Sequence, residues 1–120
     1  MSSFKLPVRA INPKREDLIS PTVEALVDTG SELTWLPEEL LTTIGITPRR
    51  EKLFQTAIGQ RLRRSIGYAI IACDNFETND EIVFAQPGDM TLLGVRTLEG
   101  FGVLADPIAH RLVASTTIAA

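Results

Sequence analysis

Residues 24–40, which read EALVDTGSELTWLPEEL, decide the fold that we expect for this chain. The apolar run Ala25–Val27 predicts the end of a buried strand, and Asp28 follows it directly. Asp28, Thr29 and Gly30 favour a turn, because Asp and Thr side chains bond to nearby backbone and Gly accepts a positive φ. An unpaired carboxylate buried at this place would be costly. The stretch therefore predicts either an ordinary turn at a strand end or a loop that holds Asp28 in a site.

Length and composition predict one globular domain that spans residues 1–120. The chain has 44% hydrophobic residues, which is enough to build a core. Its formal net charge is −3, and its basic residues are scattered except for Arg61, Arg63 and Arg64, so we expect no nucleic-acid partner. The start of the sequence lacks the layout of a signal peptide, and no apolar run approaches the roughly 18 residues that a membrane span needs. We therefore expect a soluble, cytoplasmic protein without membrane association.

The low content of cysteine and histidine argues against two common kinds of site. Cys73 and His110 are the single residues of their types. One of each does not make a tetrahedral zinc site, and a lone histidine argues against a Ser-His-Asp triad. We expect no metal site, and we interpret Cys73 as a small buried residue on a strand.

Strand patterns separated by turn residues dominate the chain. Within residues 61–73, Leu62, Ile66, Tyr68, Ile70 and Ala72 share one face by period-two spacing. The predicted strands cover residues 4–11, 21–27, 51–57, 61–73, 81–85, 103–105 and 111–115, with polar connections at 12–17 and 74–80 and short helices at 37–45 and from 90–94 to 102. This pattern predicts an all-β fold, a small closed β-barrel with one or two short helices.

Two motifs in this order resemble a known family. The segment Ala25–Ser31 (ALVDTGS), followed later by Thr91–Gly94 (TLLG), resembles the paired signature of the retropepsin-like aspartic proteases. The resemblance extends roughly from Phe4 to Val113, and it is closer to the small bacterial and retrotransposon-type members than to the viral enzymes. It implies that the barrel is of the acid protease type.

The resemblance implies roles for the residues of the first motif. Asp28 would be the catalytic carboxylate. Thr29 would form hydrogen bonds across a dimer axis, and Gly30 would let the substrate backbone approach. Ser31 would support the same loop, whereas the plain interpretation of Thr29 is an ordinary threonine at a strand end.

The long hairpin between the motifs corresponds to the flap of the family, which closes over bound peptide. Its tip would comprise Thr56, Ala57, Ile58 and Gly59, before Gln60. The alternative is that any long hairpin has such a turn, and the glycine-rich tip of the viral enzymes is absent from this sequence.

In the second motif, Leu92 and Leu93 are core residues on either interpretation, and Gly94 would permit close packing against the Asp28 loop. The chain departs from the retroviral pattern by placing a valine before Arg96. We hypothesise that Glu32 and Arg96 form an ion pair that braces the site.

Hydrolysis of peptide bonds in this family needs two carboxylates that share a proton. The chain carries one Asp-Thr-Gly and is too short for two lobes, so a catalytic site requires Asp28 from each of two copies. The sequence therefore predicts a homodimeric aspartic endopeptidase that binds an extended peptide or protein and needs no cofactor. Residues 113–118 or 4–8 could pair at the dimer interface. The alternative is a noncatalytic dimeric peptide-binding or scaffold domain that keeps the fold.

Overall fold

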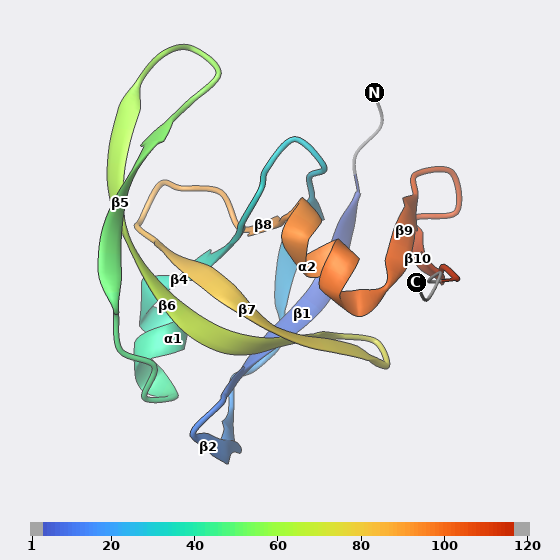
Figure 1. Cartoon of the computed structure of the whole chain (residues 1–120), viewed down its shortest axis with the longest axis horizontal. Coiled ribbons are helices and arrows are strands. Elements are labelled where there is room, and N and C mark those ends of the chain that lie inside the picture. The colour runs from blue at the N-terminus through green and yellow to red at the C-terminus, as the bar shows by residue number, and fades with distance from the viewer. Residues whose placement is uncertain (1–3, 117–120) are drawn as a thin grey trace, which may run out of the picture.

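The computed structural model describes residues 4–116, which form ten strands and two short helices (Figure 1). The strands are β1 (Lys5–Asn12), β2 (Arg15–Ile19), β3 (Val23–Val27), β4 (Thr34–Pro37), β5 (Arg50–Gln55), β6 (Arg61–Cys73), β7 (Phe76–Ala85), β8 (Leu92–Leu93), β9 (Val103–Asp106) and β10 (Arg111–Ala114). The helices are α1 (Glu38–Thr43) and α2 (Val95–Phe101). Neither helix in the described part of the chain is long and apolar enough to cross a membrane.

Six strands close into a ring in the order β1, β3, β8, β4, β7 and β6. The ring closes where β6 pairs antiparallel with β1, with Ala10 opposite Ile71. Because the strands return on themselves, the ring leaves no free edge along its circumference, while β2 and β5 extend from it as edge strands. The strand-rich fold with two short helices confirms the predicted fold class.

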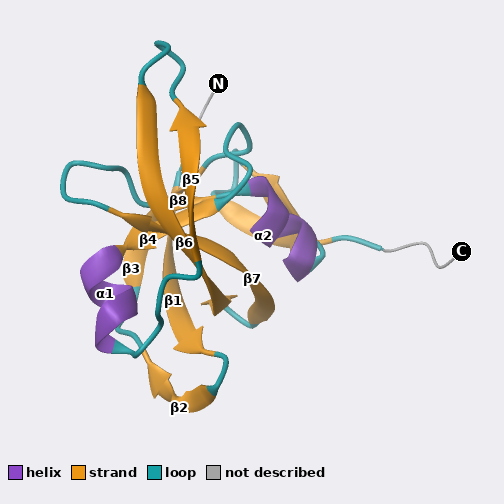
Figure 2. Cartoon of the chain, turned by 60° about the vertical axis from the view of Figure 1, so that its left-hand side comes forward, coloured by secondary structure: helices purple, strands orange, loops and turns teal. Residues whose placement is uncertain are grey.

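Apolar side chains fill the ring. Fully buried residues of the main core come from several strands and include Val8, Leu36, Ile71, Phe84 and Leu93. The two helices lie on opposite sides of the strands (Figure 2) and contribute Leu41 from α1 and Leu98 from α2 to the same core.

The face predicted for β6 is not the one that meets the main core. Ala69, Ile71 and Cys73 point into that core, whereas Ile70 and Ala72 form a small separate cluster with Ile11. Tyr68 is 47% exposed, and the Arg49 guanidinium lies 5.5 Å from the centre of its ring. The C-terminal part of β6, residues 69–73, is packed on both faces, so period-two spacing alone does not identify the side that faces the core.

Both predicted polar connections are wrong in their extent, because each contains part of a strand. Residues 15–19 form β2, an edge strand whose polar side chains face solvent. Phe76 opens β7 opposite Cys73, so the connection shrinks to the two residues Asp74 and Asn75. Asp74 adopts a φ of 53°, which a two-residue hairpin turn requires.

The second predicted helix begins later than expected. Leu92 and Leu93 form β8, which lies between β3 and β4, and α2 starts at Val95. The helix ends at Phe101, and the C-cap residue Gly102 adopts the left-handed conformation with a φ of 73°.

The strands β9 and β10 form a separate antiparallel hairpin, as predicted from the turn at Asp106. It packs beside the start of β1, because the ring of His110 stacks on that of Phe4 with centroids 5.2 Å apart. The N-terminal end of β1 and this hairpin therefore lie side by side (Figure 1).

Candidate active site

The loop that carries Asp28 is fixed by hydrogen bonds of the Asp28 side chain and of the backbone. Asp28 Oδ1 accepts a hydrogen bond from Gly30 N at 2.9 Å, and Asp28 O accepts one from Ser31 N at 3.1 Å. Asp28 N donates to Leu93 O at 3.0 Å, which joins the end of β3 to β8. Thr29 and Gly30 are exposed at the outer side of this turn. The carboxylate is thus half-buried and oriented by its own loop.

The second motif lies directly behind this loop. Val95 N donates to Ser31 O at 2.8 Å, and Arg96 N donates to Glu32 O at 3.1 Å. Gly94 is so close to the loop that a Cβ placed on it would lie 2.4 Å from Leu33 O. A residue with any side chain does not fit there without moving the backbone of the Asp28 loop.

Two buried threonines, which sequence reasoning missed, join the two motifs. Thr34 Oγ1 accepts a hydrogen bond from Gly94 N at 2.9 Å and lies 2.6 Å from Thr97 Oγ1. Thr97 Oγ1 donates in turn to Asp80 Oδ2 at 3.2 Å. Both threonines are fully buried. The one available signal was that Thr34 shares the inward side of its strand with Leu36, so that its hydroxyl needs a partner.

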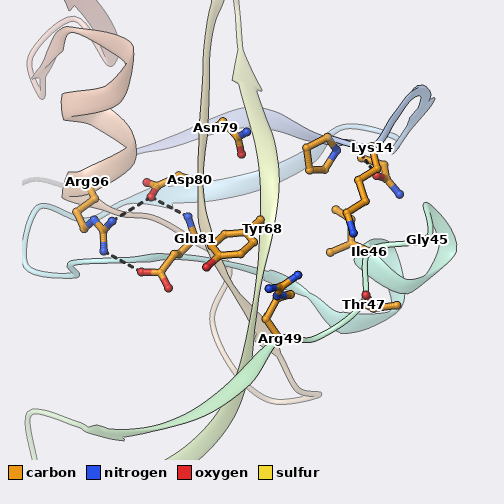
Figure 3. A pocket seen from close by; sticks show the side chains of 12 residues that line it. Lys14, Gly45, Ile46, Thr47, Arg49, Tyr68, Asn79, Asp80, Glu81 and Arg96 are labelled. Carbon is orange, nitrogen blue, oxygen red and sulfur yellow. Dashed lines mark hydrogen bonds and ion pairs between the residues drawn. The ribbon is translucent and has the colours of Figure 1, made fainter.

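The predicted pair of Glu32 and Arg96 is present as the longest of three ion pairs. Arg96 lies 3.9 Å from Glu32, 3.6 Å from Asp80 and 3.1 Å from Glu81. Figure 3 shows the pairs with Asp80 and Glu81. The Glu32 side chain is 67% exposed, which weakens the pair through screening. A hydrogen bond from Arg50, and a weaker effect of one from Arg96, lower the pKa of Glu81 below its ordinary range. Arg96 is therefore held chiefly by β7.

A cleft of about 840 Å³ opens above Asp28. Its floor is the Asp28 loop, and its roof comes from the hairpin of β5 and β6. Its apolar lining consists of Leu33, Trp35, Phe54, Ala57, Leu62, Pro87, Met90 and Leu92. The Trp35 and Phe54 rings pack at 5.0 Å between centroids, which joins floor to roof at this point.

A second cavity of about 540 Å³ lies away from this cleft, on the outer side of the ring (Figure 3). Lys14, Arg49 and Tyr68 line it together with the ion pairs of Arg96. Its lining does not include Asp28, so the first cleft is the one that bears on the predicted chemistry.

The stretch of the chain that contains both motifs matches a known family. The family model described as Aspartyl protease matches residues 18–97, which is more than half of the chain. This chain belongs to the retropepsin-like aspartic protease family.

The solution structure of Simian Foamy Virus (mac) protease has a similar fold, with a TM-score of 0.54 and 20% sequence identity. The match covers 80% of this chain and 92% of that one. No curated protein matches the chain.

In this aspartyl protease family member, the residues predicted for the tip of the flap lie at the turn of the β5–β6 hairpin. Thr56 N donates to Gln60 O at 2.8 Å and Gly59 N donates to Thr56 O at 2.9 Å, which closes the turn. Ile58 is 88% exposed at its apex, and Gly59 has a φ of 84°. The turn therefore stands at the far end of the cleft roof from the body of the ring (Figure 1).

Proposed function

We propose that this protein is an aspartic endopeptidase whose active unit is a homodimer, with Asp28 from each copy forming the catalytic pair. The observation that carries this proposal is the position of Asp28 on the floor of an 840 Å³ cleft beneath a β-hairpin. The chain has one Asp-Thr-Gly, and hydrolysis by this chemistry uses two carboxylates, so the site is incomplete without a second copy.

In the proposed mechanism, the two Asp28 carboxyl groups hold one proton between them. The ionised group takes a proton from a water molecule, and the oxygen of that water forms a bond to the peptide carbonyl carbon. The protonated group gives its proton to the carbonyl oxygen, which yields a neutral tetrahedral diol. As the diol collapses, the carboxyl group that took the proton from water gives it to the leaving nitrogen and the C–N bond breaks. The other carboxylate takes a proton from a diol hydroxyl, which restores the pair with one shared proton. No acyl-enzyme forms, and the reaction needs no metal or organic cofactor.

The hydrogen bond from Gly30 N to Asp28 Oδ1 supports this role, because it fixes the orientation of the carboxylate within its loop. We assign the exposed Thr29 to hydrogen bonds between the two loops across the dimer axis. Glycine at position 30 keeps the side of the carboxylate open, because a Cβ there would crowd Asp28 Oδ1 at 3.2 Å and would meet no other atom within 4 Å. Substrate backbone can approach the carboxylates on that side.

We place the dimer contact on the outer face of the β9–β10 hairpin. Leu104 and Val113 lie opposite each other in the register and are 67% and 39% exposed, and Ile108 at the turn is 93% exposed. The hairpin, the start of β1 and the Asp28 loop point toward the same side of the molecule (Figure 1). Of the two terminal segments considered from the sequence, residues 4–8 already pair with β3 along one edge, and residues 117–118 lie outside the described residues.

The proposed substrate is an extended peptide that lies between the hairpin and the Asp28 loop. Hairpin strands offer backbone groups to such a peptide, and alternate side chains enter the apolar lining formed by Trp35, Phe54 and Leu62. Closure of the hairpin over the peptide would exclude water from the reacting bond.

The deciding experiment compares the wild type with Asp28→Asn on an unfolded protein such as casein. We expect the variant to lose cleavage by about 10² to 10⁴-fold, because an amide neither takes a proton from water nor gives one to the carbonyl oxygen as a carboxyl group does. Asp17→Asn is the matched control, since Asp17 lies exposed on β2 away from the cleft. Sedimentation must show that all three proteins form the same oligomer.

Equal cleavage by wild type and Asp28→Asn would exclude the assignment. A wild type that dimerises and binds peptide without cleaving it would favour the noncatalytic peptide-binding or scaffold alternative. Leu104→Lys tests the interface, because a buried lysine at the contact should convert dimer to monomer and abolish cleavage. A Leu104→Lys protein that remains dimeric and active would move the interface elsewhere.

A further inference from the structure

One ion pair joins the β5–β6 hairpin to the turn of residues 86–89. These two segments form two facing walls of the cleft. Arg64 on β6 donates from Nε to Asp89 Oδ2 at 2.6 Å and from Nη2 to Asp89 Oδ1 at 2.8 Å. The two side chains are 16% and 12% exposed. A two-point contact between a guanidinium and a carboxylate fixes direction as well as distance, and little water reaches this one.

Asp89 is itself rigidly placed in the turn of residues 86–89. Its Oδ2 also accepts a hydrogen bond from Gln86 N at 2.8 Å, and its own N–H donates to Gln86 O at 2.9 Å. Gln86 Nε2 donates to Glu38 Oε2 at 2.9 Å, which ties the turn to α1. The hydrogen bond from Arg64 holds the pKa of Asp89 below its ordinary range, so the carboxylate stays ionised. The turn is thus a firm anchor on the body of the molecule.

Arg64 contacts this anchor at the place where the hairpin leaves the ring. The ladder between β6 and β7 ends at Ile66 opposite Val83. Beyond Ile66, the backbone pairs of the hairpin are between β5 and β6 alone, from Ser65 to Arg61. Among residues 4–116, the Arg64–Asp89 pair is the one ion pair that joins this outer part of the hairpin to the rest of the chain.

We infer that Arg64 and Asp89 are positioning residues that set the distance between the hairpin and the turn of residues 86–89, and so the width of the substrate cleft. Phe54 and Leu62 lie opposite each other on the hairpin, and Pro87 and Met90 lie on the other wall. With the pair in place, Arg64 holds the base of the outer hairpin to the turn of residues 86–89, in addition to the packing of Phe54 on Trp35 farther out. Without it, that packing alone holds the outer hairpin, so the cleft widens from Ile66 outward and bound peptide makes weaker contact with Pro87 and Met90. This inference rests on the proposed peptidase function.

Hydrogen exchange tests the tie without any need for activity. Arg64→Gln and Asp89→Asn should each speed exchange of the backbone amides in residues 53–63 by about tenfold, while the β6–β7 ladder is unchanged. Arg63→Gln is the matched control, since Arg63 is the next residue on β6 and its ion pair with Glu51 at 3.9 Å is exposed and internal to the hairpin. It should leave the exchange of these amides as in the wild type.

Peptide cleavage tests the effect on the substrate. Both variants should raise KM by about five- to tenfold and change kcat by less than about twofold, because the lost contact is made in the ground state as well as the transition state. The double variant should be no worse than either single one, since the two residues share one interaction. A purely structural role would instead lower the fraction of active enzyme and leave KM unchanged.

Each outcome decides the inference. The amide oxygen of Asp89→Asn can still accept the hydrogen bond from Gln86 N, so this variant should keep the turn folded. If hydrogen exchange in residues 53–63 of this variant is unchanged, the Arg64–Asp89 pair does not hold the hairpin, even if Arg64→Gln fails to fold. Faster exchange with unchanged KM overturns the positioning role. If the wild type cleaves nothing, the proposed peptidase function fails, and peptide affinity measured by titration replaces KM, with the same expected five- to tenfold loss.

Discussion

Replacement of Gly94 by alanine is the sharpest test of how the two motifs are held together. A Cβ at this position would lie 2.4 Å from Leu33 O, 2.5 Å from Leu33 C and 3.0 Å from Glu32 O. All three atoms belong to backbone, so no side-chain rotation relieves the contact. The φ of −89° and ψ of 171° at Gly94 are open to any residue. The cost of the substitution is therefore steric and not conformational.

The geometry gives the size of the effect. Ordinary carbon–oxygen contact requires the loop of Glu32 and Leu33 to move by about 1 Å. Hydrogen bonds from Val95 N to Ser31 O and from Arg96 N to Glu32 O would be strained by this shift. We expect the free energy of unfolding to fall by about 3 kcal/mol, at the upper end for an overpacked site. On the proposed mechanism, a displacement of this size in the Asp28 loop lowers kcat/KM by about a hundredfold.

Urea unfolding followed by circular dichroism measures the change in stability. Gly102→Ala is the control, because a Cβ there has no atom within 4 Å but the residue has a φ of 73°. That substitution should cost about 1–2 kcal/mol through backbone conformation alone. If Gly94→Ala proves no more destabilising than Gly102→Ala, the close contact between the motifs does not constrain the loop, and the reasoning is wrong.

Three further predictions concern buried polar groups. Thr34→Val should destabilise the fold by about 2 kcal/mol, because it leaves the buried Gly94 N without an acceptor. Thr43→Val, on the exposed side of α1, should cost far less. Urea unfolding of the two variants measures the difference. The lowered pKa of Asp89 means that its ion pair adds stability above the pKa of the unfolded state and loses it as pH falls through the folded-state value. The stability gap between wild type and Asp89→Asn should therefore shrink from pH 7 to pH 3, and a constant gap would contradict the assignment. Burial raises the pKa of Cys73 to about 11, so a thiol reagent at pH 8 should label it only after unfolding, and rapid labelling of the native protein would disagree.

The strand content could be predicted because period-two patterns and turn residues are local. The hairpin of β5 and β6 and the helix α1 lie within a residue or two of their predicted bounds. Residues 15–17 and 76–80 were assigned to connections because they are largely polar, but edge strands and outward-facing strand ends carry polar residues too. Composition along the chain does not show which segments will find a pairing partner.

The site divides in the same way. Asp28 and Gly94 were singled out from the sequence because each belongs to a short motif. Thr34, Thr97 and the Arg64–Asp89 pair were not, because each depends on a partner far along the chain. A threonine on a strand or an arginine on a hairpin is an ordinary residue until its partner is known.

The sequence by itself determined the family motifs, the all-β class and the carboxylate at the end of an apolar strand, because these follow from neighbouring residues. The tertiary structure decided that β1 and β6 close the ring, that Gly94 lies against Leu33, and that Arg64 reaches Asp89 across the cleft. The physical reason is that such contacts join residues far apart in the chain, and the residues around each of them do not indicate which partner it will meet. Their energies arise only once packing has brought the backbone of one segment against another.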